Sequence, residues 1–125
     1  MKIVVADDMP AAALEPLAGQ GWTITNTAGR PREELLAALA GADALIVRSA
    51  TKVTAELLDA APRLRIVARA GTGVDTIDVP AATARGVLVV NAPGANSVSV
   101  AELAMAMMLS MSRYAPTGPL PSPTR

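Results

Sequence analysis

An apolar run of the chain ends in Arg69 and is followed at once by the turn Gly71-Thr72-Gly73 and then by Asp75. A glycine-flanked turn of this kind exposes backbone N–H groups beside a fixed positive charge, which is how many proteins hold a carboxylate or a phosphate. Short connections between a strand and a helix also carry glycine only to change direction. Taken alone, the turn leaves both an anion site and an ordinary loop open.

Other polar residues also come directly after apolar runs. They are Asp7, Asp8, Arg48, Ser49, Thr51, Asn91, Asn96 and Ser97. If the apolar runs are parallel strands, their carboxyl ends meet at the edge where ligands of open α/β sheets bind. Guanidinium, hydroxyl and amide groups gathered there suit an acidic metabolite with carboxylate and phosphate groups.

Composition and charge exclude several classes of protein. The chain has 125 residues and is 51% hydrophobic, which is enough for one domain with its own core. Its 11 basic and 11 acidic residues balance and only Trp22 and Tyr114 are aromatic, so we expect no nucleic-acid partner. With no Cys and no His, the commonest zinc ligands and the usual general base are missing, and we assign no metal site.

The N-terminal segment runs from Met1 into a short apolar stretch and then to Asp7 and Asp8, which is too short and too acidic for a signal peptide. No apolar run approaches the ~20 residues of a membrane span. We therefore expect a cytoplasmic protein that has no membrane partner.

Five short apolar runs are predicted to be strands. They are Lys2–Ala6, Trp22–Thr25, Ala44–Val47, Arg65–Ala68 and Val87–Val90. Most are continuously apolar, as parallel strands are when helices cover both faces. Because strands alternate with helical segments, we predict an α/β fold. It is a flavodoxin-like, doubly wound parallel sheet of five strands in the order 2-1-3-4-5, within three α/β/α layers.

Helical segments between the strands are marked by capping residues and apolar spacing. Thr54 and Asp78 are expected N-caps, and Gly86 is expected to end a helix in the left-handed conformation. The expected helices are Pro10–Leu17, Pro31–Ala40, Ala55–Ala61 and a segment from Asp78 to Arg85.

A longer helix is expected at about residues 98–112, where Ser99 and Glu102 have the spacing of a capping box. It is apolar on more than one face, which indicates either a buried core helix or one that packs on something larger than its own sheet. Such a surface, if exposed, would promote self-association through this helix.

Residues 114–125 are rich in proline and are predicted to form a flexible tail, so the domain is expected to comprise residues 1–113.

Two other α/β classes share single features with this chain. Receiver domains of response regulators also carry acidic residues like Asp7 and Asp8, but they need an Asp where Arg48 stands and a Lys where Asn91 stands. A dinucleotide fold shares the glycine turn, but its G-x-G-x-x-G fingerprint needs a small residue in place of Thr76, and the ribose-binding acid is missing. We therefore expect Asp7 and Asp8 to lie in a solvated loop or to cap the first helix.

Three motifs in the same order resemble the phosphoglycerate dehydrogenase branch of the NAD-dependent D-2-hydroxyacid dehydrogenase family. The motifs lie at residues 47–54, 69–75 and 96–102, within a similarity that covers roughly residues 1–113. In that family the N-terminal segment forms a flavodoxin-like substrate domain before the chain enters a Rossmann domain.

The resemblance implies roles for four residues. Arg48 would bind the phosphate of a small phosphorylated hydroxy acid, the backbone of Thr72 and Gly73 would hold its carboxylate, and Asn96 would orient it. Thr72 would also lie near the nicotinamide of the cofactor.

Other residues near these motifs have less direct roles. Arg69 would either add positive charge to the substrate pocket or form an ion pair with Asp75 or Asp78. Ser49 and Ser97 would hydrogen-bond to the residues that contact substrate.

The family reaction, as the resemblance implies it, transfers hydride from C2 of 3-phosphoglycerate to NAD. A His accepts the hydroxyl proton, and this chain has no His. We therefore expect the substrate-binding portion of a phosphoglycerate dehydrogenase of serine biosynthesis, inactive as the isolated chain and binding NAD weakly or not at all. The alternative is a free-standing flavodoxin-like module that binds an anion or a partner without catalysis.

Overall fold

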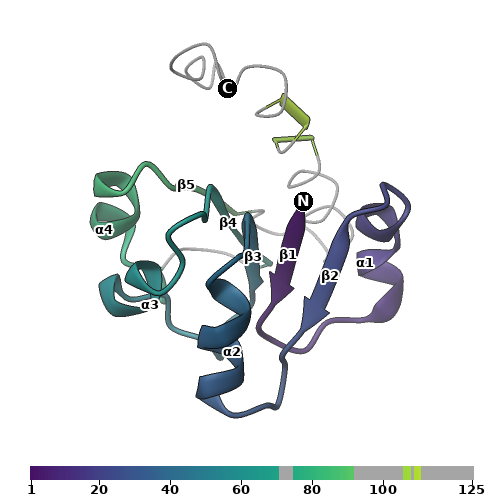
Figure 1. Cartoon of the computed structure of the whole chain (residues 1–125), viewed down its shortest axis with the longest axis horizontal. Helices are drawn as coiled ribbons and strands as arrows, with labels where there is room; N and C mark the ends of the chain where they lie inside the picture. The colour runs from purple at the N-terminus through teal and green to yellow at the C-terminus, as the bar shows by residue number, and fades with distance from the viewer. Residues whose placement is uncertain (71–74, 92–105, 108, 111–125) are drawn as a thin grey trace.

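A computed structural model of this chain describes residues 1–70, 75–91, 106–107 and 109–110. Within these residues, five parallel strands form one sheet in the order β2-β1-β3-β4-β5 (Figure 1). The strands are β1 (Lys2–Val5), β2 (Thr23–Asn26), β3 (Ala44–Val47), β4 (Ile66–Arg69) and β5 (Leu88–Asn91). The predicted α/β fold and strand order are confirmed.

Helices cover both faces of the sheet. They are α1 (Ala11–Ala18), α2 (Arg32–Leu39), α3 (Ala55–Asp59) and α4 (Val79–Ala84). The buried residues of α2, α3 and α4 join Val4, Leu45 and Val67 of the strands in one core cluster. On the opposite face, Leu17 of α1 joins Ile3 in a second cluster. These two clusters on either side of the sheet give the three layers that were predicted.

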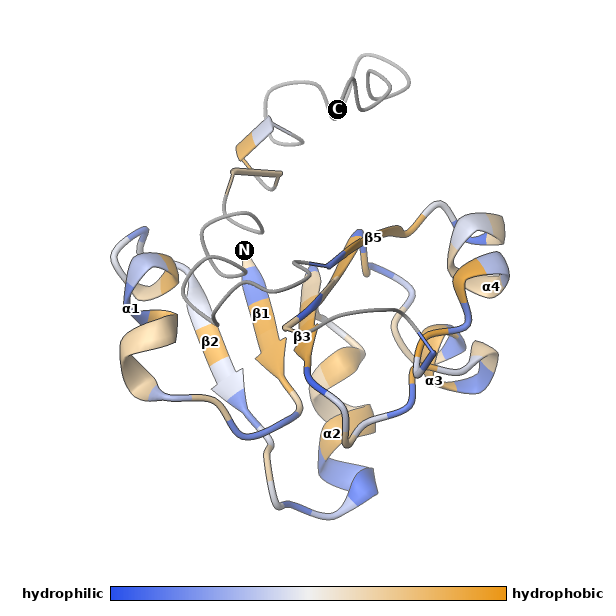
Figure 2. Cartoon of the chain, turned by 180° about the vertical axis from the view of Figure 1, so that it is seen from behind, coloured by the Kyte–Doolittle hydropathy of each residue, from blue (hydrophilic) through white to orange (hydrophobic). Residues whose placement is uncertain are grey.

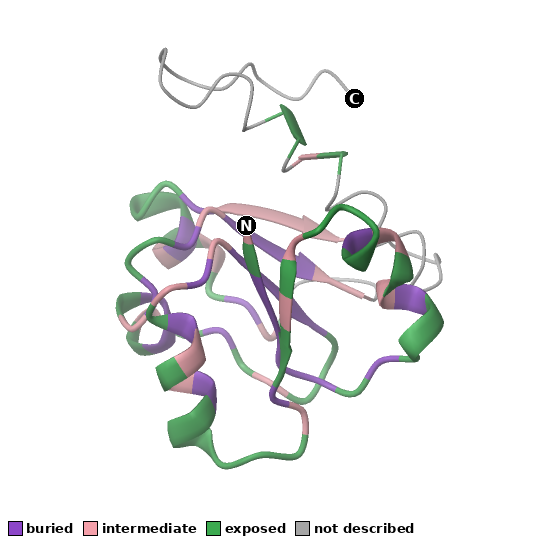
Figure 3. Ribbon diagram, turned by 45° about the vertical axis from the view of Figure 1, so that its right-hand side comes forward, coloured by how far each residue is buried: buried purple, intermediate pink, exposed green. Residues whose placement is uncertain are grey.

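The central strand β3 shows why continuous apolar runs form this sheet. All four of its residues are buried, with Leu45 and Val47 in one core cluster and Ala44 and Ile46 in the other. Successive side chains of a strand point to opposite faces, so a strand covered by helices on both sides must be apolar at every position. The inner strands are accordingly apolar (Figure 2) and buried, whereas β2 at the edge is largely exposed (Figure 3).

The capping residues expected for α3 and α4 are found in their roles. The Thr54 side chain accepts a hydrogen bond from Leu57 N at 3.2 Å, and Asp78 Oδ1 accepts one from Ala81 N at 3.0 Å. Gly86 follows Arg85, the C-cap residue of α4, and has a φ of 71°, a conformation that glycine adopts without steric cost.

Several predicted element ends differ by one or two residues from the structure. β4 and β5 continue to Arg69 and Asn91, one residue beyond the end of each apolar run, because backbone pairing continues there. β2 is shifted in the same direction and starts after Trp22, whereas α3 ends at Asp59. The shift places Arg69 opposite both Val47 and Asn91, inside the sheet rather than in the following turn.

Four residues of the expected last helix are described, and all four are helical. Met107 packs against the core cluster on the α1 side of the sheet, and Leu109 is 44% exposed. The remainder of that helix and the proline-rich residues 114–125 lie outside the described residues. In the described part of the chain, every helix is too short or too polar to cross a membrane.

The doubly covered sheet predicts a large stability effect at Leu45, which is fully buried in β3. Leu45→Ala should lower the free energy of unfolding by about 3 kcal/mol, because it removes apolar contacts and leaves a cavity. Leu36→Ala, at a half-buried position of α2, is the matched control and should cost less than half as much. Urea unfolding followed by circular dichroism measures both, and equal losses would contradict the assigned core.

Candidate functional site

The sheet has a topological switch point between β1 and β3. The chain leaves β1 toward β2 on one side and returns to β3 on the other. The helices that follow these two strands, α1 and α3, pack on opposite faces of the sheet. Neighbouring strands with this arrangement leave a crevice at their carboxyl ends, where ligands of doubly wound folds bind. Asp7 follows β1 at this crevice and Arg48 follows β3.

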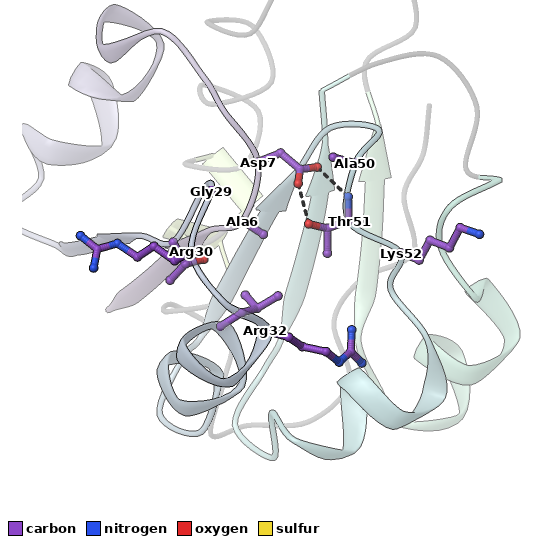
Figure 4. Close-up of a pocket in the computed structure, with 10 residues that line it drawn as sticks. Ala6, Asp7, Gly29, Arg30, Arg32, Ala50, Thr51 and Lys52 are labelled. Carbon is purple, nitrogen blue, oxygen red and sulfur yellow. Dashed lines mark hydrogen bonds between the residues drawn. The ribbon is translucent and has the colours of Figure 1, made fainter.

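Asp7 joins the loops on the two sides of the switch point. Its Oδ2 accepts hydrogen bonds from Arg48 N at 2.7 Å and from Thr51 N at 3.2 Å, and its Oδ1 accepts one from Thr51 Oγ1 at 2.5 Å. We call these three hydrogen bonds the Asp7 clamp. Figure 4 shows the bonds from Thr51 as dashed lines. Asp7 is only 5% exposed, and a buried carboxylate is costly unless donors of this kind surround it.

The expectation that Asp7 lies in a solvated loop or caps the first helix is wrong. The N-cap residue of α1 is Pro10, which makes no side-chain capping bond, and Asp7 is buried against the loop after β3. The physical reason is the strand order, since β3 pairs with β1 and brings three donors to the carboxylate. Asp8 does have an exposed side chain, as the solvated-loop interpretation expected.

Arg48 and Ser49 lie at the carboxyl end of β3, and both are exposed. Arg48 Nη1 donates a hydrogen bond to the backbone oxygen of Asp8 at 2.9 Å. The backbone of Arg48 is thus held by the Asp7 clamp, while its guanidinium lies against the loop after β1. One end of this residue is fixed and the charged end stays accessible to an anion.

Arg69 lies beside Arg48. It is the last residue of β4, and its Nε donates a hydrogen bond to the backbone oxygen of Arg48 at 3.2 Å. Asp78, one of the two ion-pair partners considered for Arg69, uses Oδ1 to cap α4. The structure therefore brings together Arg48, Ser49 and Arg69 at one edge of the sheet. Arg69 also supports the loop that carries Arg48.

The other predicted site residues are Thr72, Gly73, Asn96 and Ser97, and they lie outside the described residues. Their assigned roles stay predictions. The prediction that the chain has no metal site can be examined only for the described residues. Among them there is no group of three or more acidic residues able to hold a metal ion.

The sequence and the fold match a known family. The chain belongs to the D-isomer specific 2-hydroxyacid dehydrogenase family, whose catalytic-domain model matches residues 3–117. Among its relatives, D-3-phosphoglycerate dehydrogenase of Mycobacterium tuberculosis is 53% identical over 114 residues, which are 91% of this chain and 21% of that protein. The enzyme of the same name from Archaeoglobus fulgidus is 46% identical over 116 residues, which are 93% of this chain and 22% of that protein. The chain thus spans about a fifth of the length of these relatives.

Solved structures agree with the family. The NAD⁺-bound 3-phosphoglycerate dehydrogenase of Entamoeba histolytica has a TM-score of 0.69 and 31% sequence identity, covering 98% of this chain and 43% of that chain. The TT0316 protein of Thermus thermophilus has the same TM-score with 30% identity, covering 100% of this chain and 43% of that chain. The family resemblance predicted from the three motifs is confirmed.

The residue that sequence reasoning missed is Asp7 in its positioning role, together with its partner Thr51. Both had been placed at strand ends, but nothing local connects two residues that lie 44 positions apart. The available signal was the predicted strand order, which puts β1 beside β3. Polar residues that follow two neighbouring strands, such as Asp7 and Thr51, could have been considered as hydrogen-bond partners on that ground.

The Asp7 clamp predicts opposite results for two neighbouring aspartates. Asp7→Ala should lower the free energy of unfolding by about 2–4 kcal/mol, because it leaves buried donors of Arg48 and Thr51 without an acceptor. Asp8→Ala should change it by less than about 0.5 kcal/mol, since only the backbone oxygen of Asp8 is used. Denaturant unfolding of both variants gives the comparison, and similar losses would refute the clamp.

Proposed function

We propose that this chain forms the substrate-binding wall of a D-2-hydroxyacid dehydrogenase that oxidises 3-phosphoglycerate, the first step toward serine. The observation that carries the proposal is the position of Arg48. It lies at the switch-point edge of the sheet, with its backbone held by the Asp7 clamp and its guanidinium exposed. The relatives named D-3-phosphoglycerate dehydrogenase support the choice of substrate.

In this proposal, Arg48 binds the phosphate of the substrate. One hydrogen bond to Asp8 orients its guanidinium, and the planar group offers further N–H donors in a geometry that suits phosphate oxygens. Arg69 adds a second positive charge and holds the Arg48 carbonyl through Nε. Two neighbouring arginines at one edge favour a doubly charged anion over a neutral ligand.

The remaining contacts of the proposal come from the glycine turn and from Asn96. Backbone N–H groups of Thr72 and Gly73 bind the substrate carboxylate, and the Asn96 side chain orients the substrate.

The family is NAD-dependent, and NAD when bound supplies the hydride acceptor. The residues of this chain do not fit the principal NAD site. In dinucleotide folds an acidic residue about twenty positions after the glycine turn binds the ribose, whereas β5 ends in that region at the amide Asn91. We assign only Thr72 to the cofactor.

A second candidate is a module that binds an anion without catalysis. It is favoured by the absence of any His in the 125-residue chain, since the family reaction needs a base to accept the hydroxyl proton. Both candidates use the same edge of the sheet. They differ in whether the bound ligand must be a hydroxy acid.

The proposed phosphate contact predicts an effect of Arg48 on ligand binding. In a titration of the ¹⁵N-labelled chain with 3-phosphoglycerate, the amides of Arg48, Thr72 and Asn96 should shift together. Arg48→Gln should weaken binding by about tenfold, because a charge-assisted contact is lost. Arg63→Gln, whose side chain is 71% exposed near the opposite end of the sheet, is the charge-matched control. Unmoved amides, or equal weakening by the control, would show that the site is wrongly assigned.

The absence of His, the base of the family reaction, predicts that the 125-residue chain does not turn over substrate. With 3-phosphoglycerate and NAD, the absorbance of NADH at ~340 nm should not rise above that of a buffer blank. The substrate isomer 2-phosphoglycerate distinguishes the two candidate functions. A substrate-binding domain should bind 3-phosphoglycerate several times more tightly than 2-phosphoglycerate, whereas a general anion-binding module should bind the two isomers with equal affinity. Measurable formation of NADH would show that a residue of this chain acts as the base, and it would contradict the prediction of no turnover.

A further inference from the structure

A polar cavity lies beside the loop that carries Arg48, on the side of that loop that faces α2. Its volume is about 420 Å³, which falls within the range of small-molecule sites. It is lined by Ala6, Asp7, Thr27, Gly29, Arg30, Arg32, Leu35, Ala50, Thr51 and Lys52 (Figure 4). Arg48, Ser49 and Arg69 do not line it, whereas Asp7 and Thr51 do. The cavity therefore adjoins the edge assigned to the substrate but does not share the side chains proposed to bind it.

Three of the lining side chains are cationic. In the view of Figure 4, the exposed side chains of Arg30 and Lys52 extend outward on opposite sides of the cavity, and that of Arg32 lies below them. Arg30 forms an exposed ion pair with Glu34 at 3.2 Å, and Arg32 forms one with Glu56 at 3.9 Å. Exposed pairs of this kind contribute little, so an anion can compete for both guanidinium groups.

The one acidic residue that lines the cavity is Asp7, and its carboxylate is already committed. It accepts the three hydrogen bonds of the Asp7 clamp and is nearly fully buried. Neutral donors from the loop after β3 therefore stabilise its negative charge. The cationic side chains at the rim face no exposed carboxylate within the lining.

The backbone at the start of α2 adds to this electrostatic environment. The N-cap residue is Pro31, which has no side chain that can accept a hydrogen bond from the first turn, and Arg32 is the first helical residue. Uncapped N–H groups and the helix dipole favour negative charge near such a helix start, and Glu33 and Glu34 of the first turn already supply part of it. Gly29, with a φ of 74°, allows the tight turn that brings this helix start to the cavity.

We propose that this cavity binds the phosphate group of a small molecule, at a site separate from the substrate edge. The proposal goes beyond the function proposed above. Arg32 and Lys52 come from the two sides of the cavity, at the start of α2 and in the loop before α3. Both side chains are exposed, and in this proposal the Lys52 side chain turns inward to hold the anion together with Arg32. Arg30 would add to the attraction at the rim.

Inorganic phosphate at low ionic strength is the first probe. Titration of the ¹⁵N-labelled chain should shift the amides of Gly29, Arg32, Thr51 and Lys52 in a saturable way, with half-saturation in the low millimolar range. No saturable shift up to about 20 mM phosphate would overturn the proposal. Glycerol 3-phosphate tests the source of the phosphate group: tighter binding than inorganic phosphate indicates a phosphorylated metabolite, and equal binding indicates free phosphate.

Two double variants test whether the cations of the cavity are responsible. Arg32→Gln with Lys52→Gln should weaken phosphate binding by about three- to tenfold. Lys2→Gln with Arg63→Gln removes the same charge at the opposite end of the sheet and should leave the affinity within about twofold. Equal weakening by the two double variants would mean general charge screening and would refute the site.

Arg48→Gln separates this site from the substrate edge. It should leave the phosphate-induced shifts of Gly29 and Lys52 unchanged, while it weakens the binding of 3-phosphoglycerate at the substrate edge. Loss of the cavity shifts in Arg48→Gln would assign both effects to a single site and overturn the proposal. Dispersed amide spectra of every variant confirm that the fold is retained.

Discussion

The buried carboxylate of Asp7 organises the carboxyl-end edge of this sheet. The strand order creates a crevice between β1 and β3, and the Asp7 clamp closes its base with three hydrogen bonds from the loop after β3. A carboxylate that is 5% exposed is tolerable only with such donors, so the loop is held in one conformation. The same contacts fix the backbone of Arg48, on which the proposed phosphate contact depends.

The loop of residues 48–52 has two sides with different surroundings. Arg48 and Arg69 lie toward the edge of the sheet assigned to the substrate, whereas Thr51 and Lys52 line the cavity beside α2. Both sides are rich in cationic groups, although the whole chain carries no net charge. The positive charge is thus gathered locally, around a loop whose own negative partner is buried.

The sheet was predictable from the sequence because its physical requirement is local. A strand covered on both faces must be apolar throughout, and β3 meets this requirement in its own four residues. Thr54, Asp78 and Gly86 were likewise recognised because a cap acts within one helical turn. The role of Asp7 was not recognised, since its partners lie more than forty residues away and its sequence neighbours resemble those of a solvated loop. Arg69 fell one residue outside its predicted strand because its polarity, not its backbone pairing, ended the apolar run.

The central claim is that Asp7 positions Arg48 for an anionic substrate. A double-mutant cycle with Asp7→Asn and Arg48→Gln, read out as the dissociation constant for 3-phosphoglycerate, tests it most directly. Asn keeps the shape of the side chain but weakens the charge-assisted bonds to Arg48 N and Thr51 N. The account predicts that Asp7→Asn weakens binding severalfold when Arg48 is present and hardly at all in the Arg48→Gln background. Equal weakening in both backgrounds would contradict it.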